Sequence, residues 1–504
     1  MPASTTLLQR LLAAAAALSL VAAVGANASI ARAITAPTIT VIDINPEGDS
    51  YALDDDDKDG VAVNGMLLFR ADDGIHGRDL YKSDGTVDGT VLVKDINPTG
   101  DSSPVNMVAM GTTAYFRADD GTNGFELWKS DGTEAGTVMV KDINTSGASN
   151  PRYLVVVGNT LYFRADDGTN GKELWKSDGT EAGTVMVKDI NTTGDSNPYS
   201  VTALGSTLYF KADDGTNGLE LWKSDGTETG TVMVKDIGPD VVSSDPYELT
   251  ALGSTLYFSA TDGPDGYELW KSDGTEVGTV MVKNINPSGD SYPSELTVLG
   301  STFYFTADDG TNSRELWKSD GTEAGTVMVK DINTTGESYP SELTVLGSTL
   351  YFKADDGTND NELWKSDGTE AGTVMVKDIN PTGSANVGAL TRHGGLLYFQ
   401  GYDGVNGDEM YLSDGTEEGT MRIPGPNGSN YVDCDCYENP VRATSNGVFF
   451  TYDDDTVGNE LGFIADRLPE TNTSGNALAL ALLALSGALA AGAVIARSKE
   501  LRAN

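Results

Sequence analysis

Short apolar stretches alternate with polar, Asp- and Gly-rich turns through most of the chain. The segment from Ser341 to Ile379 is representative and reads SELTVLGSTLYFKADDGTNDNELWKSDGTEAGTVMVKDI. Its apolar and β-branched residues gather at 343–346, 349–354, 362–365 and 373–379, without the three-to-four-residue period of an amphipathic helix. The intervening turns contain Asp, which tolerates turn geometry, and Gly, which supplies positive φ. The pattern therefore predicts four short strands joined by tight turns.

This pattern recurs along the chain at a fixed interval. Six copies carry a Trp at one repeat position, and these are all the Trp residues of the chain; Tyr81 and Tyr411 replace Trp in the outermost copies. The tetrapeptide SDGT begins at residues spaced by 47, with one interval of 48: Ser83, Ser130, Ser177, Ser224, Ser272, Ser319, Ser366 and Ser413. Four strands in about 40–50 residues are typical of a β-propeller blade. A β-helix has a shorter period, and an immunoglobulin-like sandwich needs about 100 residues per unit.

The two ends of the repeat region predict how the ring closes. Residues 38–44 (TITVIDI) match a fourth strand, while residues 448–453 and 459–466 match a second and a third strand without a clear fourth. The N-terminal strand can therefore complete the last blade. The prediction is a single all-β propeller over residues 38–466 with nine four-stranded blades; eight blades with a degenerate cap are the alternative. Both faces of a blade pack on neighbours, so we expect the Trp column in the core rather than as exposed platforms for sugars.

The repeat resembles the bacterial ELWxxDGT repeat family, through ELWKSDGT at Glu126–Thr133 and five further copies. The resemblance covers roughly residues 38–466. It implies an exported, surface-associated repeat protein and leaves the biochemical role undefined.

Both termini read as targeting segments. Residues 1–28 combine Arg10, an apolar run and a small-x-small site at Ala26-Asn27-Ala28, which predicts a signal peptide followed by a linker at 29–37. Residues 477–496 are free of charge and long enough for one transmembrane helix, and the basic tail at 497–504 is expected in the cytoplasm. The propeller is then outside, at the cell surface.

A sorting-like motif lies in the linker at residues 467–476, just before the apolar span. Leu468, Pro469, Glu470 and Thr471 resemble the LPxTG cell-wall sorting signal of Gram-positive bacteria, but Asn472 stands where that signal has Gly. Attachment by a sortase and a plain membrane anchor both remain open.

Charge narrows the classes of ligand. The chain has 33 Lys and Arg against 75 Asp and Glu, a formal net charge of −42. A protein that neutralises nucleic-acid phosphates needs a basic face, so nucleic acid is excluded as a partner. The same charge disfavours direct docking onto anionic lipid, and contact with the membrane is expected through the C-terminal anchor only.

The acidic residues recur in turns, which makes them candidates for Ca²⁺ binding. The second-to-third turns and the connections between blades should emerge on one face, and dense carboxylates are the ligands that Ca²⁺ prefers. Turn formation and solubility are the alternative role for these residues. The candidates are Asp119, Asp120, Asp166, Asp167, Asp213, Asp214, Asp308, Asp309, Asp355 and Asp356, with Asp195 and Glu337 on the connections.

A sharper calcium candidate is the D-x-D-x-D-G sequence formed by Asp55, Asp57, Asp59 and Gly60. An EF-hand is excluded, because Met66 occupies the position of the bidentate Glu and the flanks read as strands. An isolated calcium loop remains.

Few residues suit catalysis. His76 and His393 lack a nucleophile pattern and read as turn or surface residues, and Cys434 and Cys436 are close enough in sequence for a strained local bridge.

The function predicted is a monomeric, surface-displayed binding or adhesion module without enzyme activity, whose ligand is a cation, an extracellular glycan or a protein. A structural envelope or acidic coat protein is the alternative, and a polysaccharide-acting enzyme is the third reading.

Overall fold

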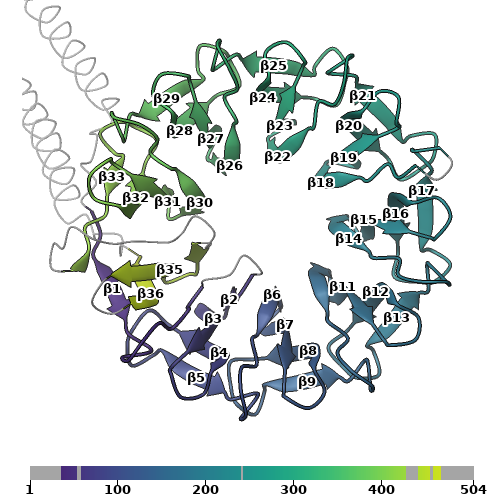
Figure 1. Ribbon diagram of the computed structural model, residues 1–504, viewed down its shortest axis with the longest axis vertical. Helices are drawn as coiled ribbons and strands as arrows, with labels where there is room; N and C mark the ends of the chain where they lie inside the picture. The colour runs from purple at the N-terminus through teal and green to yellow at the C-terminus, as the bar shows by residue number, and fades with distance from the viewer. Residues whose placement is uncertain (1–35, 54–57, 240–241, 427–440, 455–457, 467–504) are drawn as a thin grey trace, which may run out of the picture. The chain divides into compact units, whose positions relative to one another are not determined.

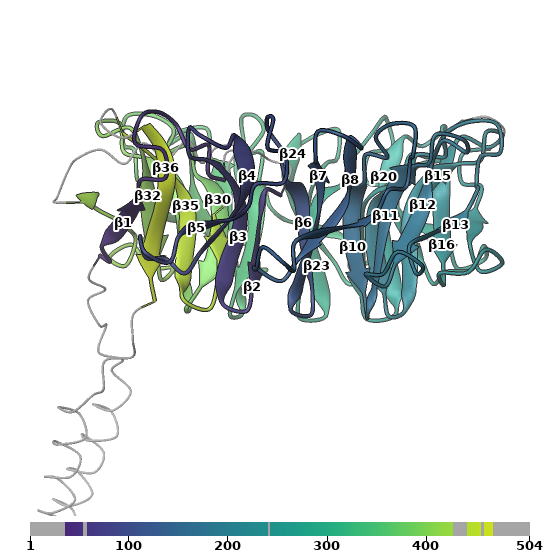
Figure 2. The same cartoon turned by 90° about the horizontal axis from the view of Figure 1, so that it is seen from below.

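The computed structural model describes residues 36–53, 58–239, 242–426, 441–454 and 458–466. Within these residues the chain forms nine four-stranded antiparallel sheets. The sheets stand around a central axis as the blades of a propeller (Figure 1), and from the side their strands run between two rims of loops (Figure 2). The nine-bladed ring predicted from the repeats is confirmed, and the eight-bladed alternative is wrong.

The inner half of each blade consists of its first two strands, and the first strands of successive blades contact one another around the axis. The innermost strands are β2 (Gly60–Val63), β6 (Val105–Met110), β10 (Arg152–Val157), β14 (Tyr199–Leu204), β18 (Tyr247–Leu252), β22 (Ser294–Leu299), β26 (Ser341–Leu346), β30 (Gly388–His393) and β34 (Arg442–Ala443). The second strands are β3 (Met66–Asp72), β7 (Thr113–Asp119), β11 (Thr160–Asp166), β15 (Thr207–Asp213), β19 (Thr255–Thr261), β23 (Thr302–Asp308), β27 (Thr349–Asp355), β31 (Leu396–Tyr402) and β35 (Gly447–Asp454).

The outer half consists of the third and fourth strands. The third strands are β4 (Arg78–Ser83), β8 (Phe125–Ser130), β12 (Lys172–Ser177), β16 (Leu219–Ser224), β20 (Tyr267–Ser272), β24 (Arg314–Ser319), β28 (Asn361–Ser366), β32 (Asp408–Ser413) and β36 (Gly458–Ala465). The outermost strands are β5 (Val91–Lys94), β9 (Val138–Lys141), β13 (Val185–Lys188), β17 (Val232–Lys235), β21 (Val280–Lys283), β25 (Val327–Lys330), β29 (Val374–Lys377), β33 (Met421–Arg422) and β1 (Ile39–Ile42). In the representative copy, the predicted strands correspond in order to β26, β27, β28 and β29.

The N-terminal strand closes the ring as predicted. β1 pairs antiparallel with β36, with Ile39 opposite Ile464 and Ile42 opposite Leu461, so this blade combines the two ends of the described chain. Its innermost strand β34 contacts both β2 and β30. In a closed ring every blade packs on a neighbour at both faces, whereas an open array would expose the outer faces of its two end blades.

The core lies between neighbouring blades. Trp364 is only 5 % exposed and packs with Phe352 of its own blade and Tyr304 of the preceding blade. Along β27, Phe352 faces the preceding blade and Tyr351 the following one, because successive side chains of a strand point to opposite faces. The other five Trp residues are also buried, which confirms the core role predicted for the column.

The SDGT motif builds the turn between the third and fourth strands. The Ser366 hydroxyl accepts a hydrogen bond from the Gly368 amide (3.0 Å) and lies 2.8 Å from the Thr373 hydroxyl. One Asp367 oxygen accepts from both the amide and the hydroxyl of Thr369 (2.9 and 2.7 Å). The motif thus recurs because its polar side chains satisfy the backbone of a tight turn.

Several segments predicted from the sequence lie outside the described residues. These are the signal peptide (1–28), most of the linker at 29–37, the sorting-like segment with Leu468, Pro469, Glu470 and Thr471, the apolar span (477–496), the basic tail (497–504), and Cys434 and Cys436. The part of the chain that is described contains no helix of the length and apolarity needed to cross a membrane.

Candidate functional site

The second-to-third turns with the sequence Ala-Asp-Asp-Gly, which we call the ADDG turns, use their carboxylates to hold the backbone. In the turn at residues 119–123, Asp119 accepts a hydrogen bond from the Gly121 amide at 2.7 Å. Asp120 accepts from the amides of Thr122 and Asn123 and, through its other oxygen, from the Asn123 side chain at 2.7 Å. The same bonds recur at Asp166, Asp167, Asp213, Asp214, Asp308, Asp309, Asp355 and Asp356.

These bonds also keep the second Asp of each pair charged. Partial burial opposes ionisation of Asp120, but the hydrogen bonds from Asn123 and Thr122 outweigh it and hold the pKa of Asp120 below its ordinary value. In the residues described, no group of three or more His, Cys, Asp or Glu side chains is arranged to hold a metal ion. The carboxylate oxygens of these turns therefore have a structural role, which is to hold the backbone of the turn.

The blade-to-blade connections lie beside the ADDG turns, as predicted. Asp195, on the connection from β13 to β14, accepts hydrogen bonds from the backbone amide of Lys172 at 3.0 Å and from its ammonium group at 2.9 Å. The hydrogen bond from the Lys172 side chain is the main cause that lowers the pKa of Asp195. We call this surface, formed by the ADDG turns and the connections, the DDG face.

A buried carboxylate column, which we did not predict, anchors the connections. Glu315 of the ELW motif is fully buried and accepts hydrogen bonds from the Ile332 amide (2.8 Å) and the Ser338 hydroxyl (2.6 Å). Burial raises its pKa to about 7. The same buried position holds Asp79, Glu126, Glu173, Glu220, Glu268, Glu362, Glu409 and Glu460. The sequence does contain a signal for this column, because every repeat has an acidic residue within an otherwise apolar strand.

The structure describes one of the three Asp residues of the predicted calcium loop. Asp59 is fully buried, and its Oδ2 lies 3.6 Å from a guanidinium nitrogen of Arg70. Asp59 also interacts electrostatically with Arg442. Burial lowers the pKa of Arg442, and the negative charge of Asp59 partly offsets that lowering. Asp55 and Asp57 lie outside the described residues.

The two histidines occupy separate blades. His76 lies at the end of the first ADDG-type turn, where its Nδ1 is 2.8 Å from an Asp73 oxygen, as the Asn side chain is in other blades. His393 contacts Asp466 through Nε2. Each histidine is thus engaged with a carboxylate of its own surroundings.

A hollow on the DDG face is lined by two tyrosines of neighbouring blades, whose rings contact each other. Tyr153 of β10 and Tyr199 of β14 have ring centroids 6.0 Å apart and an interplanar angle of 31°. The Arg164 guanidinium lies 4.8 Å from the Tyr153 ring centroid and 3.4 Å from the Asn197 side-chain oxygen. The hollow measures about 360 Å³ and is also lined by Asp195 and Asp213, which places it near the lower end of ligand pockets, about 300–1,000 Å³.

Ring and ion contacts extend from this hollow to the next blades. The Lys211 ammonium lies 4.0 Å from the Tyr199 ring centroid and 2.6 Å from an Asp245 oxygen. Asp245 accepts a second hydrogen bond from the Tyr267 hydroxyl at 3.3 Å. Burial, followed by the charge of Asp245, raises the pKa of Tyr267 to about 12, so its hydroxyl keeps the proton.

The contacts continue through three further rings. The centroids of Tyr247 and Tyr267 are 5.7 Å apart, and those of Tyr267 and Tyr292 are 5.4 Å apart with an interplanar angle of 22°. We call Tyr153, Tyr199, Tyr247, Tyr267 and Tyr292 the tyrosine track; they come from four successive blades, beginning at β10, β14, β18 and β22.

Left-handed backbone presents two of these rings to solvent. Tyr153 has a φ of 56° and Tyr292 a φ of 44°, and their side chains are 44 % and 43 % exposed. At Tyr153 the pairing of β10 with β11 shifts register between Arg152 and Val155, and such a bulge re-aims the side chain. Other blades place Asn106, Ser200, Glu248, Glu295, Glu342 or Ala389 at the position of Tyr153, so the paired tyrosines distinguish one part of the ring.

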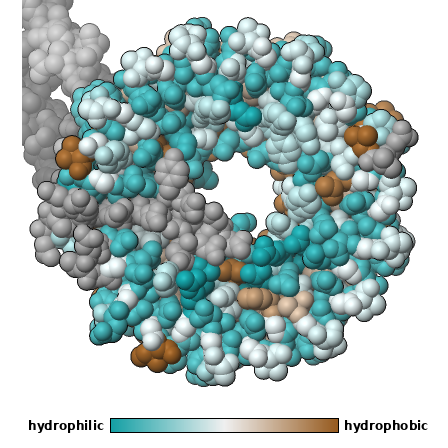
Figure 3. Space-filling model, viewed as in Figure 1, coloured by the Kyte–Doolittle hydropathy of each residue, from teal (hydrophilic) through white to brown (hydrophobic). Residues whose placement is uncertain are grey.

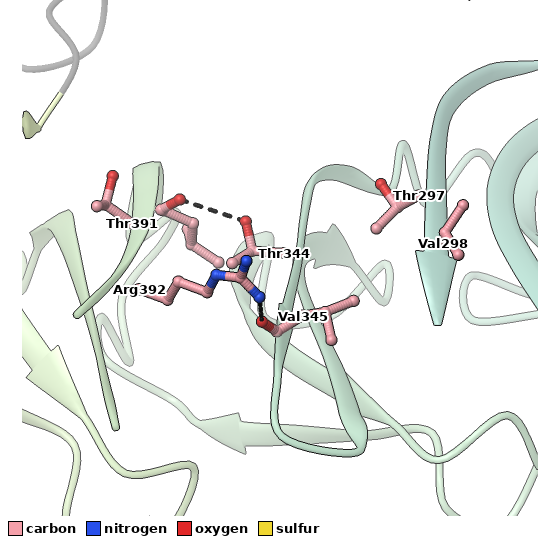
Figure 4. Close-up of a pocket in the computed structure, with 7 residues that line it drawn as sticks. Thr297, Val298, Thr344, Val345, Thr391 and Arg392 are labelled. Atoms are coloured by element: carbon pink, nitrogen blue, oxygen red, sulfur yellow. Dashed lines mark hydrogen bonds between the residues drawn. The ribbon is translucent and has the colours of Figure 1, made fainter. Parts of the chain in front are cut away.

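A second hollow, of about 430 Å³, lies on the innermost strands β22, β26 and β30 (Figure 4). The Thr344 hydroxyl donates to the Leu390 carbonyl and Arg392 donates to the Val345 carbonyl, each at 3.2 Å. These bonds join neighbouring blades, so the polar groups of this hollow contribute to the packing of the ring.

The face shown in Figure 3 is mainly hydrophilic, with separate hydrophobic spots around a central opening. Isolated apolar residues are normal on a protein surface and mark no interface by themselves. The hydrophobic spots of this face therefore do not by themselves indicate an interface.

No family model matches the chain, and the search of curated proteins found no match either. Solved structures resemble it at 12 % identity. A prolyl endopeptidase has a TM-score of 0.39, covering 69 % of this chain and 52 % of that chain, and puromycin hydrolase has 0.36, covering 73 % and 61 %. The β-propeller domain of the Trilobed protease from Pyrococcus furiosus has 0.35, covering 64 % and 96 %. The chain spans about half to three fifths of the first two proteins, and the likeness concerns the fold alone.

Proposed function

We propose that this chain is a binding or adhesion module that acts through the DDG face of its propeller. The tyrosine track supports this proposal most directly, because exposed aromatic rings beside hydrogen-bonding side chains are typical of recognition surfaces. Left-handed backbone holds two of its rings outward; because that backbone recurs at the same positions of other blades, the tyrosine side chains themselves distinguish this part of the ring.

Surface display is part of the proposal and rests on the sequence. The signal-like residues 1–28 would direct export, and residues 477–496 with the basic tail would hold the chain at the cell surface, with or without sortase attachment at Thr471. The resemblance to the ELWxxDGT repeat family points the same way. The propeller would then present its DDG face outside the cell.

A ring of repeated blades suits a binding function better than a catalytic one. Each blade offers similar connections on one face, so several weak contacts to one surface can combine into strong attachment. The polar groups around the histidines and in the inner hollow already serve turns and blade contacts. A polysaccharide-acting enzyme would be favoured instead by release of product from a polysaccharide panel.

Retention of cells on surfaces tests the proposal. A non-adherent bacterial host displaying the full chain should be retained under flow better than a host displaying the triple variant Tyr153→Ala, Tyr267→Ala, Tyr292→Ala. Equal surface amounts of the two chains are established by antibody labelling. Equal retention of the two hosts would contradict binding through the DDG face.

An acidic structural coat is the second candidate, favoured by the exposed Asp of each SDGT turn. Asp367 is one example: the hydrogen bond from the Thr369 hydroxyl lowers its pKa, so it stays charged. A coat would form ordered arrays without ligand, and electron microscopy of the displayed chain distinguishes it from an adhesin.

A further inference from the structure

We propose that the tyrosine track binds a chain of neutral sugars, with the hollow lined by Tyr153 and Tyr199 as its most specific subsite. The inference rests on the proposed function and adds the chemical class of the ligand. It starts from a surface region where neighbouring blades bring tyrosine rings together instead of repeating the same side chains.

The track spans four successive blades, so an extended ligand rather than a single small molecule would contact all of it. Rings from four successive blades are joined by direct contacts, from Tyr153 to Tyr199, then through Lys211 and Asp245 to Tyr267 and Tyr292. The negative face of each aromatic ring attracts weakly positive C–H groups. A sugar ring presents such C–H groups on its face, so sugars can pack against the two exposed rings, Tyr153 and Tyr292.

The polar groups beside the rings call for a ligand rich in hydroxyl donors. Asp195, Asp213 and Asn197 line the first hollow, and an ionised carboxylate can only accept hydrogen bonds. The hydrogen bond from Lys172 keeps the pKa of Asp195 low, so this group is an acceptor at neutral pH. Sugar hydroxyls can donate to such acceptors in the plane of the ring while its face remains stacked.

The charges favour a neutral sugar over an acidic one. Lys172 is paired with Asp195 and Lys211 with Asp245, at 2.9 and 2.6 Å. Arg164 is covered by Tyr153 and hydrogen-bonded to Asn197. Arg164, Lys172 and Lys211 therefore already have partners, and an anionic polysaccharide would meet a protein of formal net charge −42.

A proline-rich peptide is the competing occupant, since such peptides also bind aromatic-lined grooves. Proline has no amide hydrogen, so such a peptide offers carbonyls to the donor Arg164 but few donors to the acceptors Asp195 and Asp213 that also line the hollow. Acceptor facing acceptor is unfavourable. The hydrogen-bonding groups of the hollow thus suit the sugar better.

Titration calorimetry of the full chain with defined oligosaccharides tests the inference. The probes are hexasaccharides of β-1,4-glucose, β-1,4-xylose, α-1,4-glucose and β-1,4-N-acetylglucosamine, each compared with its trisaccharide. At least one hexasaccharide should bind, and more tightly than its trisaccharide because it reaches more rings. Tyr153→Ala and Tyr292→Ala should each weaken binding by roughly tenfold, as removal of an anchoring ring does.

Tyr339→Ala is the matched control. Tyr339 occupies the position of Tyr292 one blade further on, with the same φ of 44°, and is 57 % exposed, but it is no member of the tyrosine track. Its removal should leave affinity unchanged. Equal loss in Tyr153→Ala and Tyr339→Ala, with circular dichroism showing that both variants are folded, would overturn the assignment to the track.

The outcomes separate this inference from the proposed function. Displayed cells that adhere through the DDG face while no neutral hexasaccharide binds would overturn the sugar inference and leave the adhesion proposal standing. Binding of a proline-rich decapeptide that Tyr153→Ala abolishes, without sugar binding, would replace sugar by peptide. Failure of adhesion and of every probe would overturn both.

Discussion

The carboxylate of Glu460 accepts a hydrogen bond from the backbone amide of Ile44 at 2.7 Å, although the two residues are 416 positions apart. Its other oxygen accepts from the Asn45 amide at 3.3 Å. The same buried acid ties the third strand to the outgoing connection within an interior blade, as Glu315 does with Ile332. In the closing blade, this repeated contact therefore joins the two ends of the ring.

Replacing this acid should loosen the closure of the ring. Glu460→Ala leaves the amides of Ile44 and Asn45 without their acceptor, and each unsatisfied buried group costs about 1–3 kcal/mol. We expect a lower melting temperature and faster hydrogen exchange of the β1 amides, measured by mass spectrometry.

Glu315→Ala is the control for this prediction. It removes the same contact from an interior blade, so it should lower the melting temperature without accelerating exchange in β1. Equal exchange of β1 in the two variants would show that Glu460 has no special part in closure.

The blade count, the order of strands and the closing strand could be predicted from two features of the sequence. These are the 47-residue period and the segments at the two ends of the repeat region that match single strands of a blade. Burial of Trp364 followed from the packing of blades on both faces. The tyrosine track could not be predicted, because it depends on left-handed backbone at Tyr153 and on contacts such as Tyr267 with Tyr292 between different repeats. The column of buried acids was visible as a repeated Glu, but its partners lie on connections 17 to 23 residues away.

The buried acids predict that the fold is more stable at mildly acidic than at neutral pH. Burial raises the pKa to about 7 at five positions, so between pH 4.5 and 7 the folded chain binds more protons than the unfolded chain and its stability falls as pH rises. These five residues are Glu173, Glu268, Glu315, Glu362 and Glu460. Scanning calorimetry should show a rising melting temperature from pH 7.5 to pH 5.

The SDGT turns set the pH below which the stability of the fold no longer rises. Hydrogen bonds from the Thr369 hydroxyl and amide lower the pKa of Asp367 below its ordinary 3.8. The contribution of ionised Asp367 to the stability of the fold is therefore present above pH 3.8 and is lost as the pH falls further. Melting temperature should therefore decline again below about pH 4. A melting temperature that increases steadily from pH 5 to pH 7.5 would contradict the role of the buried acids.

Glycine in the SDGT turn is required for two reasons that can be separated by experiment. Gly368 has a φ of 86°, and a Cβ there would lie 2.1 Å from the hydroxyl oxygen of Tyr304 in the preceding blade. Gly347 has a φ of 63° but open space around a Cβ. Gly347→Ala should cost about 1–2 kcal/mol of unfolding free energy from strain alone, and Gly368→Ala roughly 1–3 kcal/mol more from overpacking. Denaturant unfolding measures both, and equal losses would show that the close approach to Tyr304 is unimportant.

Calcium binding, measured by calorimetry on the full chain, is expected to depend on Asp57 and not on the ADDG turns. Both oxygens of Asp356 already accept hydrogen bonds, from the amides of Thr358 and Asn359 and from the Asn359 side chain. Asp356→Asn should therefore weaken its turn while leaving the calcium heat unchanged. Asp57→Ala should remove that heat, because Asp57 is the central ligand predicted from the D-x-D-x-D-G sequence. Heat that survives Asp57→Ala but disappears in Asp356→Asn would move calcium binding from that loop to the DDG face.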